Sequence, residues 1–251
     1  MSAAEAHPTL VGVFDPAGAL GAEEAQRTRA ALAGGGVPEV VSERHLVAGR
    51  VGVPRRLGRR DTARPSGSLA MVVGADFSTP AGGPSLEERF ASGFRSRGLS
   101  LLDHAAGDFL VLVWDEEGRR GLLAQDQLGG RALYYTVEGG RLLFASDVVT
   151  LLRIMRVRPS PDMLTLGHKA ANSEPPPERT VYEGVKRLCG GHALELGPDG
   201  WRRRRYWAPR YRSPDRLSAA DVQARLWELV CASIQRRTAD ATDVGLSLIH
   251  I

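Results

Sequence analysis

Two thiols and a run of four arginines are the residues of this chain whose types suggest chemistry. A cysteine thiolate can act as a nucleophile, but Cys189 stands at a turn position and Cys231 on a predicted helix, so we expect both to be small apolar fillers. The run "WRRRRYW" at 201–207 combines basic and aromatic residues, as many nucleic-acid surfaces do. Alternation along an edge strand would solvate the arginines equally well, and we expect no nucleic-acid partner.

The remaining ionisable residues are expected to be structural. The six histidines show no ligand spacing with cysteines or carboxylates, so no metal site is predicted. Asp108 and Asp126 border predicted strands, where we expect them to cap turns. Adjacent carboxylates usually lie on solvated helix faces or turns. We expect this setting for the pairs Glu23-Glu24, Glu87-Glu88 and Glu116-Glu117.

The composition is that of a globular protein. Of 251 residues, 43% are hydrophobic and 25% charged, and the formal charge of +4 is too small to indicate a polyanion partner. No stretch approaches the roughly 18 apolar residues of a membrane span. The beginning of the chain lacks the basic start and apolar core of a signal peptide, and two cysteines do not indicate a disulfide framework. We expect a cytoplasmic protein with no membrane partner.

The first 207 residues alternate predicted strands and helices, and strands dominate at 45–77. The pattern predicts a strand at 9–15, a helix from about 22, and short strands between 45 and 77. A second helix is predicted at 85–98, where Ser85 and Glu88 can form a capping box. Four apolar runs joined by glycine-containing turns predict an antiparallel meander over 108–147, followed by the proline loop 173–180 and a hairpin at 191–207.

The composition changes at 208–216, which we interpret as a linker. Ser218 and Asp221 then predict the capped start of a helix, followed by an apolar strand in "DVGLSL" at 243–248. A helix that leads into such a strand is typical of the start of a parallel α/β sheet. The predicted organisation is therefore a domain at 1–207, the linker, and the beginning of a second domain at 217–251.

Five stretches, in this order, resemble the asparagine synthetase family. They are "GDFLVLVWD" (107–115), "QDQLGGRALYY" (125–135), "FASD" (144–147), "RTVYEGVKRLCGGHAL" (179–194) and "YW" (206–207). Gln125 and Ala132 depart from the family's usual Arg and Pro. The resemblance implies an α+β fold, an N-terminal-nucleophile hydrolase-like α/β/β/α sandwich of two antiparallel sheets, followed by an α/β ATP-pyrophosphatase domain. In the family this second domain binds ATP and Mg²⁺ and adenylates a carboxylate.

The family's pyrophosphate loop should follow the strand that contains Gly245, Leu246, Ser247 and Leu248, which the resemblance implies to be the nucleotide-binding strand. The chain instead ends in "IHI", so we expect a C-terminally truncated product that holds only the first helix and strand of the ATP-binding domain. The ending "LSLIHI" also equals one translation of a common transposase-adapter sequence, which leaves open whether Leu246 to Ile251 are native. ATP and Mg²⁺ would be bound mainly by the missing half.

Glutaminase activity in this family needs a cysteine directly after the initiator methionine, because its thiolate attacks the amide and its free amino group acts as the base. The resemblance places Pro8 at that position. It also places Val73 and Gly74 at the family's Asn-Gly pair, so the amide donor to the tetrahedral intermediate is absent. Arg50 resembles the arginine that grips the carboxylate of glutamine. We expect a vestigial glutamine pocket without catalytic residues.

Relatives without the cysteine include lasso-peptide cyclases and β-lactam synthetases, whose substrates supply their own amine. By this fold-level analogy we expect the complete protein to be an ATP-dependent amide-forming ligase, with a lasso-type macrolactam cyclase as the first choice. Its partners would be a small-molecule or peptide carboxylate, and for a cyclase a precursor peptide and its protease. Two alternatives stay open: a glutamine-hydrolysing asparagine synthetase, and a non-catalytic peptide-binding or partner-binding platform that uses the arginine run and the proline loop.

Overall fold

The computed structural model describes residues 9–33, 37–52, 68–76, 83–211, 218–239 and 244–245. The chain divides into two compact units, Met1–Ala208 and Pro209–Ile251. Pro8, Leu246, Ser247, Leu248 and part of the predicted linker lie outside the described residues. Gly245 is described but is not part of a strand, so the nucleotide-binding strand stays a prediction.

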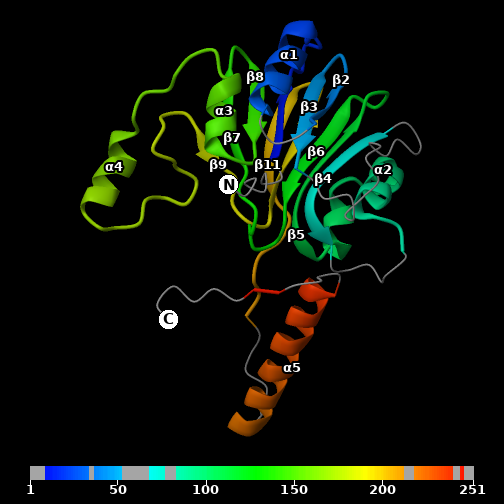
Figure 1. Cartoon of the computed structure of the whole chain (residues 1–251), viewed down its shortest axis with the longest axis vertical. Coiled ribbons are helices and arrows are strands. Elements are labelled where there is room, and N and C mark those ends of the chain that lie inside the picture. Colours follow the sequence, from blue (N-terminus) through cyan, green and yellow to red (C-terminus); the bar gives the residue numbers. More distant parts are fainter. Residues whose placement is uncertain are drawn as a thin grey trace. The chain divides into compact units, whose positions relative to one another are not determined.

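The first unit contains two antiparallel sheets (Figure 1). The first sheet has the spatial order β2 (Glu39–Ser42), β3 (Leu46–Val51), β1 (Thr9–Phe14), β8 (Arg141–Ala145), β7 (Tyr134–Glu138) and β9 (Lys186–Arg187). The second has the order β11 (Gly200–Arg205), β10 (His192–Gly197), β6 (Arg120–Gln125), β5 (Gly107–Asp115) and β4 (Ser68–Asp76). The predicted α+β class with two antiparallel sheets is confirmed.

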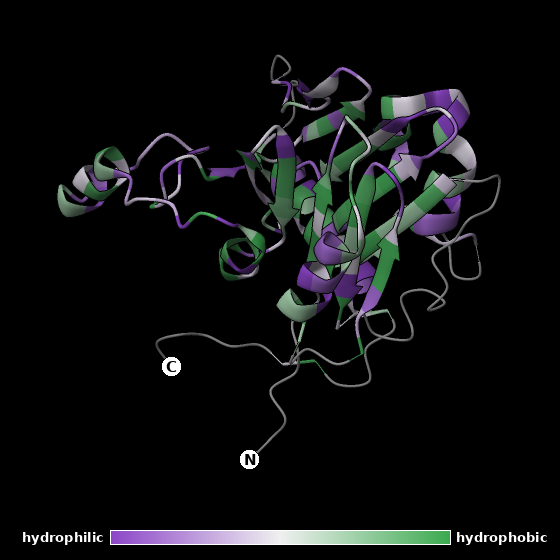
Figure 2. Ribbon diagram, turned by 90° about the horizontal axis from the view of Figure 1, so that it is seen from above, coloured by the Kyte–Doolittle hydropathy of each residue, from purple (hydrophilic) through white to green (hydrophobic). Residues whose placement is uncertain are grey.

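Alternating apolar residues place one core between the sheets and one on each outer face. Between the sheets, Phe14 of β1 packs against Trp114 of β5, with ring centroids 5.5 Å apart. The outer face of the second sheet is covered by α2 (Leu86–Arg97) and the short helix Gly98–His104, and that of the first by α1 (Ala22–Ala31) and α3 (Val148–Ile154). Figure 2 shows hydrophobic colour over much of the strands and a mixture of hydrophobic and hydrophilic colour on the helices.

Both predicted capping boxes are confirmed. At the start of α2, the Ser85 side chain accepts a hydrogen bond from the Glu88 backbone N–H while the Glu88 carboxylate accepts one from Ser85 N–H. Ser218 and Asp221 begin α5 (Ala219–Thr238) of the second unit in the same way. Among the described residues, no helix combines the length and apolar character needed to cross a membrane.

The predicted meander over 108–147 is wrong. β5 and β6 form a hairpin in the second sheet, whereas β7 and β8 form one in the first. The chain changes sheets after β6, where the buried Asp126 carboxylate accepts hydrogen bonds from Leu128 N–H (2.9 Å) and Gly129 N–H (2.8 Å). β10 and β9 occupy the edges at which β6 and β7 would have paired. The expectation that Asp126 caps a turn is confirmed.

We predict that Asp126→Ala lowers the free energy of unfolding by about 1–3 kcal/mol, because it leaves buried backbone N–H groups without an acceptor. Urea denaturation followed by tryptophan fluorescence measures the change. Asp199→Ala, in the exposed turn between β10 and β11, is the control and should stay within about 0.5 kcal/mol of the parent protein. Equal stability of the two variants would contradict this role for Asp126.

Candidate functional site

Arg50, predicted to belong to a vestigial glutamine pocket, is buried at the end of β3 with 4% exposure. Its guanidinium donates from Nε to Glu39 Oε2 (2.8 Å) and from Nη1 to the carbonyl oxygen of Val72 (2.9 Å). Nη1 also contacts the carboxylate of Glu87. The arginine is therefore engaged by two carboxylates and a backbone carbonyl of the same chain.

Glu87, on the first turn of α2, completes this cluster. It is 4% exposed, and its Oε1 accepts a hydrogen bond from Val72 N–H (2.9 Å) as well as contacting Arg50. Arg50 and Glu87 thus satisfy the carbonyl and the N–H of one residue on β4, an edge strand of the second sheet. The pair links the first sheet to the edge of the second.

Two of the adjacent acidic pairs depart from the solvated setting predicted for them. Glu87 and Glu24 are buried, each against an arginine. The sequence contained a signal for Glu87, because it lies three and seven residues before Phe90 and Phe94 and so shares their buried helix face. The prediction of a solvated pair instead followed from the residue types alone. These do not reveal that Glu87 faces a buried arginine on β3.

Burial and pairing act together on the protonation of this cluster. Burial alone would lower the pKa of Arg50, but the Glu87 and Glu39 carboxylates outweigh it and raise that pKa, so the guanidinium stays charged. Burial raises the pKa of Glu87 and outweighs the attraction of Arg50. Three ionisable groups share one site, and the guanidinium cannot be released without removing the cation that faces the buried Glu87 carboxylate.

Val73 lines a cavity of about 390 Å³, whereas the Arg50 guanidinium donates to the carbonyl oxygen of the preceding residue, Val72. The cavity has apolar and small polar walls and one cation, and its described lining residues are Thr9, Val73, Leu110, Gly130, Arg131, Ala132, Ser146 and Asp147. Arg50 is not among these residues. The structure therefore brings Val73 to a cavity at the start of β1 but turns the arginine predicted to serve that cavity toward Glu87.

Gly74 is required by a close approach of the chain. Its φ of +120° is unfavourable for other residues, and a Cβ there would meet Asp108 O at 1.9 Å and Arg131 Nε at 2.7 Å. Arg131 Nε donates to Asp108 O (3.3 Å) and lies 3.5 Å from Asp108 Oδ1. Asp108, predicted to cap a turn, instead faces Arg131. Arg131 was not predicted to line a cavity, because nothing in "LGGRAL" distinguishes it from a solvated arginine in a turn.

The other polar groups of the cavity have structural partners. Ser146 Oγ accepts a hydrogen bond from Leu10 N–H (3.1 Å), and the Asp147 carboxylate accepts one from Thr150 N–H (2.7 Å) at the start of α3. Cys189 is not among the described residues that line this cavity, and burial raises the pKa of its thiol, which disfavours the thiolate. The described residues thus provide a small cavity without an activated nucleophile.

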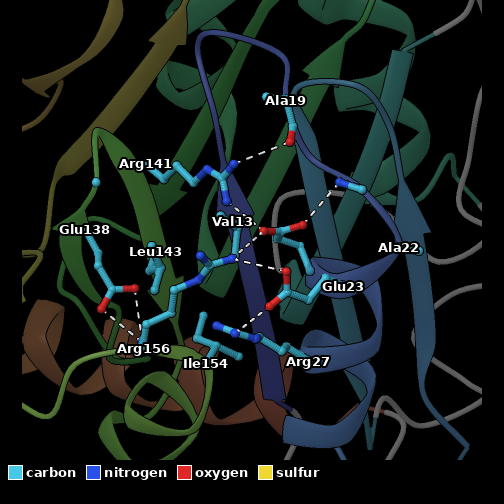
Figure 3. A pocket seen from close by; sticks show the side chains of 13 residues that line it. Val13, Ala19, Ala22, Glu23, Arg27, Glu138, Arg141, Leu143, Ile154 and Arg156 are labelled. Carbon is cyan, nitrogen blue, oxygen red and sulfur yellow. Dashed lines mark hydrogen bonds and ion pairs between the residues drawn. The ribbon is translucent and has the colours of Figure 1, made fainter.

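A larger cavity of about 540 Å³ lies on the outer side of the first sheet, between α1, the β7–β8 hairpin and the residues after α3 (Figure 3). Its floor is apolar and its rim is charged. Arg141 contacts Glu24 (2.6 Å) and Asp15 (3.0 Å), and Arg156 contacts Glu24 (3.1 Å) and Glu23 (3.4 Å). Each of these charges has a partner within the chain, so we interpret the rim as an ion-pair network that fastens α1 to the sheet.

ATP and Mg²⁺ were expected mainly outside this chain. Among the residues described, no group of three or more His, Cys, Asp or Glu side chains is placed to hold a metal ion. The three residues of the expected nucleotide-binding strand after Gly245 lie outside the described part, and neither Val244 nor Gly245 offers a side chain that could bind a phosphate. The described residues do not form a site for either group.

The comparisons with known proteins agree with this fold. Residues 85–207 match the family of the glutamine amidotransferase domain. The chain is 30% identical over 154 residues to Amidase chyE of Penicillium rubens. The matched region covers 61% of this chain and 22% of that protein. It is 32% identical over 110 residues to the glutamine-hydrolyzing asparagine synthetase 3 of Bacillus subtilis, covering 42% of this chain and 17% of that protein. The chain therefore spans about a fifth of the length of these curated relatives.

Among solved structures, the glutamine phosphoribosylpyrophosphate amidotransferase from Bacillus subtilis superimposes with a TM-score of 0.53 at 13% identity, covering 82% of this chain and 50% of that one. The two antiparallel sheets and this likeness define the fold as that of an N-terminal-nucleophile type glutamine amidotransferase domain. The matched domain and the sequence relatives support the glutamine amidotransferase class II and asparagine synthetase family for this chain.

We predict that Arg50→Met lowers the free energy of unfolding by about 3–5 kcal/mol, because it leaves the buried Glu87 without its cation. Glu87→Gln should cost less, since Arg50 keeps Glu39 and the amide oxygen can still accept from Val72 N–H. Urea denaturation at pH 7 compares the two. Equal losses, or a loss below about 1 kcal/mol for Arg50→Met, would contradict a pair that links the sheets.

The Glu24 ion pairs predict a pH dependence. Burial would raise the pKa of Glu24, but hydrogen bonds from the Gly21 and Glu24 N–H groups and the charge of Arg141 hold that pKa below its ordinary value of 4.5. A carboxyl with a lowered folded-state pKa contributes stability above its unfolded pKa and loses it as the pH falls through the folded value. Glu24→Gln should therefore be less stable than the parent by about 1–2 kcal/mol at pH 7.

This difference between Glu24→Gln and the parent should shrink toward zero as the pH falls below 4.5. Urea denaturation at a series of pH values measures it. Glu23→Gln, at a neighbouring and largely exposed carboxylate, is the control. A difference that stays constant down to the acid end of the series would show that the carboxylate charge is not responsible.

Proposed function

We propose that this chain is the amidotransferase-like part of a longer ATP-dependent, amide-forming ligase of the asparagine synthetase type, and that it has lost glutaminase activity. The relatives support a longer protein, because the chain spans about a fifth of their length. The main support for the loss of glutaminase activity is that the Arg50 guanidinium already contacts Glu87, Glu39 and Val72 O. A glutamine carboxylate would have to displace a buried carboxylate to reach the guanidinium.

Two further features support the loss. Val73 lines the cavity at the position where the resemblance expects an amide side chain, and an isopropyl group cannot donate a hydrogen bond to an oxyanion. Pro8, expected at the position of the nucleophile, offers no thiol. Without ammonia from glutamine, the amine must come from the substrate, as in intramolecular amide formation. A lasso-type macrolactam cyclase is the form of ligase we propose first, with ATP and Mg²⁺ bound by the second domain.

In the proposed reaction, the second domain transfers AMP from ATP to a substrate carboxylate and releases pyrophosphate. An amine of the same substrate then attacks the acyl carbon, forms the amide and releases AMP. The part described here would contribute a folded scaffold rather than reacting groups. The names of two relatives favour a second candidate, a glutamine-hydrolysing asparagine synthetase. That candidate requires a working glutaminase.

We predict that the purified chain releases no ammonium from glutamine above the buffer blank, because Arg50 is engaged by Glu87 and no cysteine is among the described residues that line the cavity. The longer protein, incubated with ATP, Mg²⁺ and a precursor peptide encoded beside its gene, should form AMP and pyrophosphate and a product lighter than the peptide by one water. Mass spectrometry and pyrophosphate release measure these. Ammonium release from glutamine would favour the asparagine synthetase, and no AMP with any carboxylate would overturn the ligase.

A further inference from the structure

The chain carries a further pocket on the arm that projects from the sheets (Figure 1). This arm holds α4 (Met163–Ala170) and the loop with Pro175, Pro176 and Pro177, and between them lies a cavity of about 570 Å³. We call it the arm pocket. It is separate from the cavity beside Val73, with which it shares no lining residue among those described.

The walls of the arm pocket suit an extended chain with an apolar side chain. The three consecutive prolines have fixed φ angles and form a wall that loses little conformational freedom on binding. Tyr134 and Tyr182 contribute half-buried rings, and Val148 and Val181 contribute apolar surface. Aromatic and proline surfaces of this kind are common in peptide-binding grooves.

The charge of the arm pocket favours an anion. Arg179 is neutralised by the buried Asp162 (2.6 Å), which also accepts a hydrogen bond from Thr165 N–H at the start of α4. That leaves two cations, Lys169 and Arg187, and one carboxylate, Glu174, on the pocket wall. Within the described part of the chain, the side chains of Lys169 and Arg187 have no carboxylate partner. Both are exposed, so they are available to a ligand.

The basic character continues from the arm pocket onto β11. Glu178, directly after the prolines, pairs with Arg203 of β11, and its carbonyl oxygen accepts a hydrogen bond from Arg187 N–H (2.9 Å). β11 is an edge strand that also presents the exposed residues Arg202, Arg204 and Arg205. A cationic edge beside the pocket would attract an acidic segment and orient it before it binds.

We propose that the arm pocket binds an extended peptide segment that carries carboxylates next to an apolar side chain. The surroundings favour a peptide over a nucleic acid. Trp201, the aromatic residue of the arginine run on β11, already packs edge-on against Tyr135 at 5.6 Å and is not free to stack on a base. Arg203 and Arg204 are partly neutralised by Glu178 and Glu195. This proposal does not depend on the ligase assignment.

The test is fluorescence anisotropy with the whole chain and two labelled hexapeptides. One is Ala-Phe-Gly-Leu-Asp-Asp with a free carboxyl end, and the other is Ala-Phe-Gly-Leu-Asn-Asn with an amidated end. We expect the acidic peptide to bind about tenfold or more tightly, and Lys169→Ala/Arg187→Ala to remove that preference, because each lost charge contact weakens binding several-fold. The exposed pair Arg29→Ala/Arg97→Ala removes the same charge far from the arm pocket and should change nothing.

Several results would overturn the proposal. These are equal affinity for both peptides, no acidic-peptide binding up to about 1 mM, or equal loss in the pocket and control variants. Tighter binding of a labelled twelve-residue oligouridine, lost in the pocket variant, would assign the surface to nucleic acid instead. Circular dichroism checks folding, and Lys169→Glu, which should weaken the acidic peptide further, provides a second variant. Because no ATP is present, failure of the ligase assay leaves this result unaffected.

Discussion

The contact of Arg50 with Glu87 is the interaction on which the arrangement of the two sheets depends. A sheet edge exposes unpaired N–H and C=O groups, and β4 forms an edge of the second sheet. Glu87 accepts from Val72 N–H, and Arg50, from the other sheet, donates to Val72 O. Two buried charges thus close an edge and join two layers, although burying them costs solvation. This pair stabilises the fold only while both Arg50 and Glu87 are present, because either charge alone would be buried without its partner.

This structural role limits the chemistry available at the neighbouring cavity. The Arg50 guanidinium donates from Nε to Glu39 and from Nη1 to Glu87 and Val72 O, so an external carboxylate would have to compete with Glu39 and Glu87 for it. The cavity beside Val73 retains a cation in Arg131, but that side chain crosses Gly74 and donates to Asp108 O. The glutamine amidotransferase-type fold is therefore stabilised in part by Arg50, a residue that the resemblance places in a glutamine pocket. Conservation of a fold and retention of its reaction are separable properties.

Local patterns predicted the elements well and their partners less well. The capping residues Ser85 and Ser218 and the Gly-Pro-Asp-Gly turn are determined within a few residues, so the sequence was sufficient for them. The meander failed because pairing of β6 depends on β10, about seventy residues away, and on the Asp126 turn. Glu87 was misjudged for the same reason. The resemblance identified Arg50, Val73 and Gly74, but the direction of the Arg50 side chain follows from packing between sheets.

Whether a charged side chain is structural or available for binding depends on its partners rather than on its type. Arg50, Arg141 and Arg179 each face a carboxylate of the same chain that is at least nine-tenths buried, so an external anion would have to compete with that carboxylate for the guanidinium. Lys169 and Arg187 lie exposed on the wall of a cavity without such a carboxylate partner in the described part of the chain, and an external carboxylate there displaces only water. The same criterion therefore directs attention from the cavity beside Val73 to the arm pocket, where we propose that a peptide binds. Arg50, by contrast, stabilises the fold through its buried ion pair with Glu87.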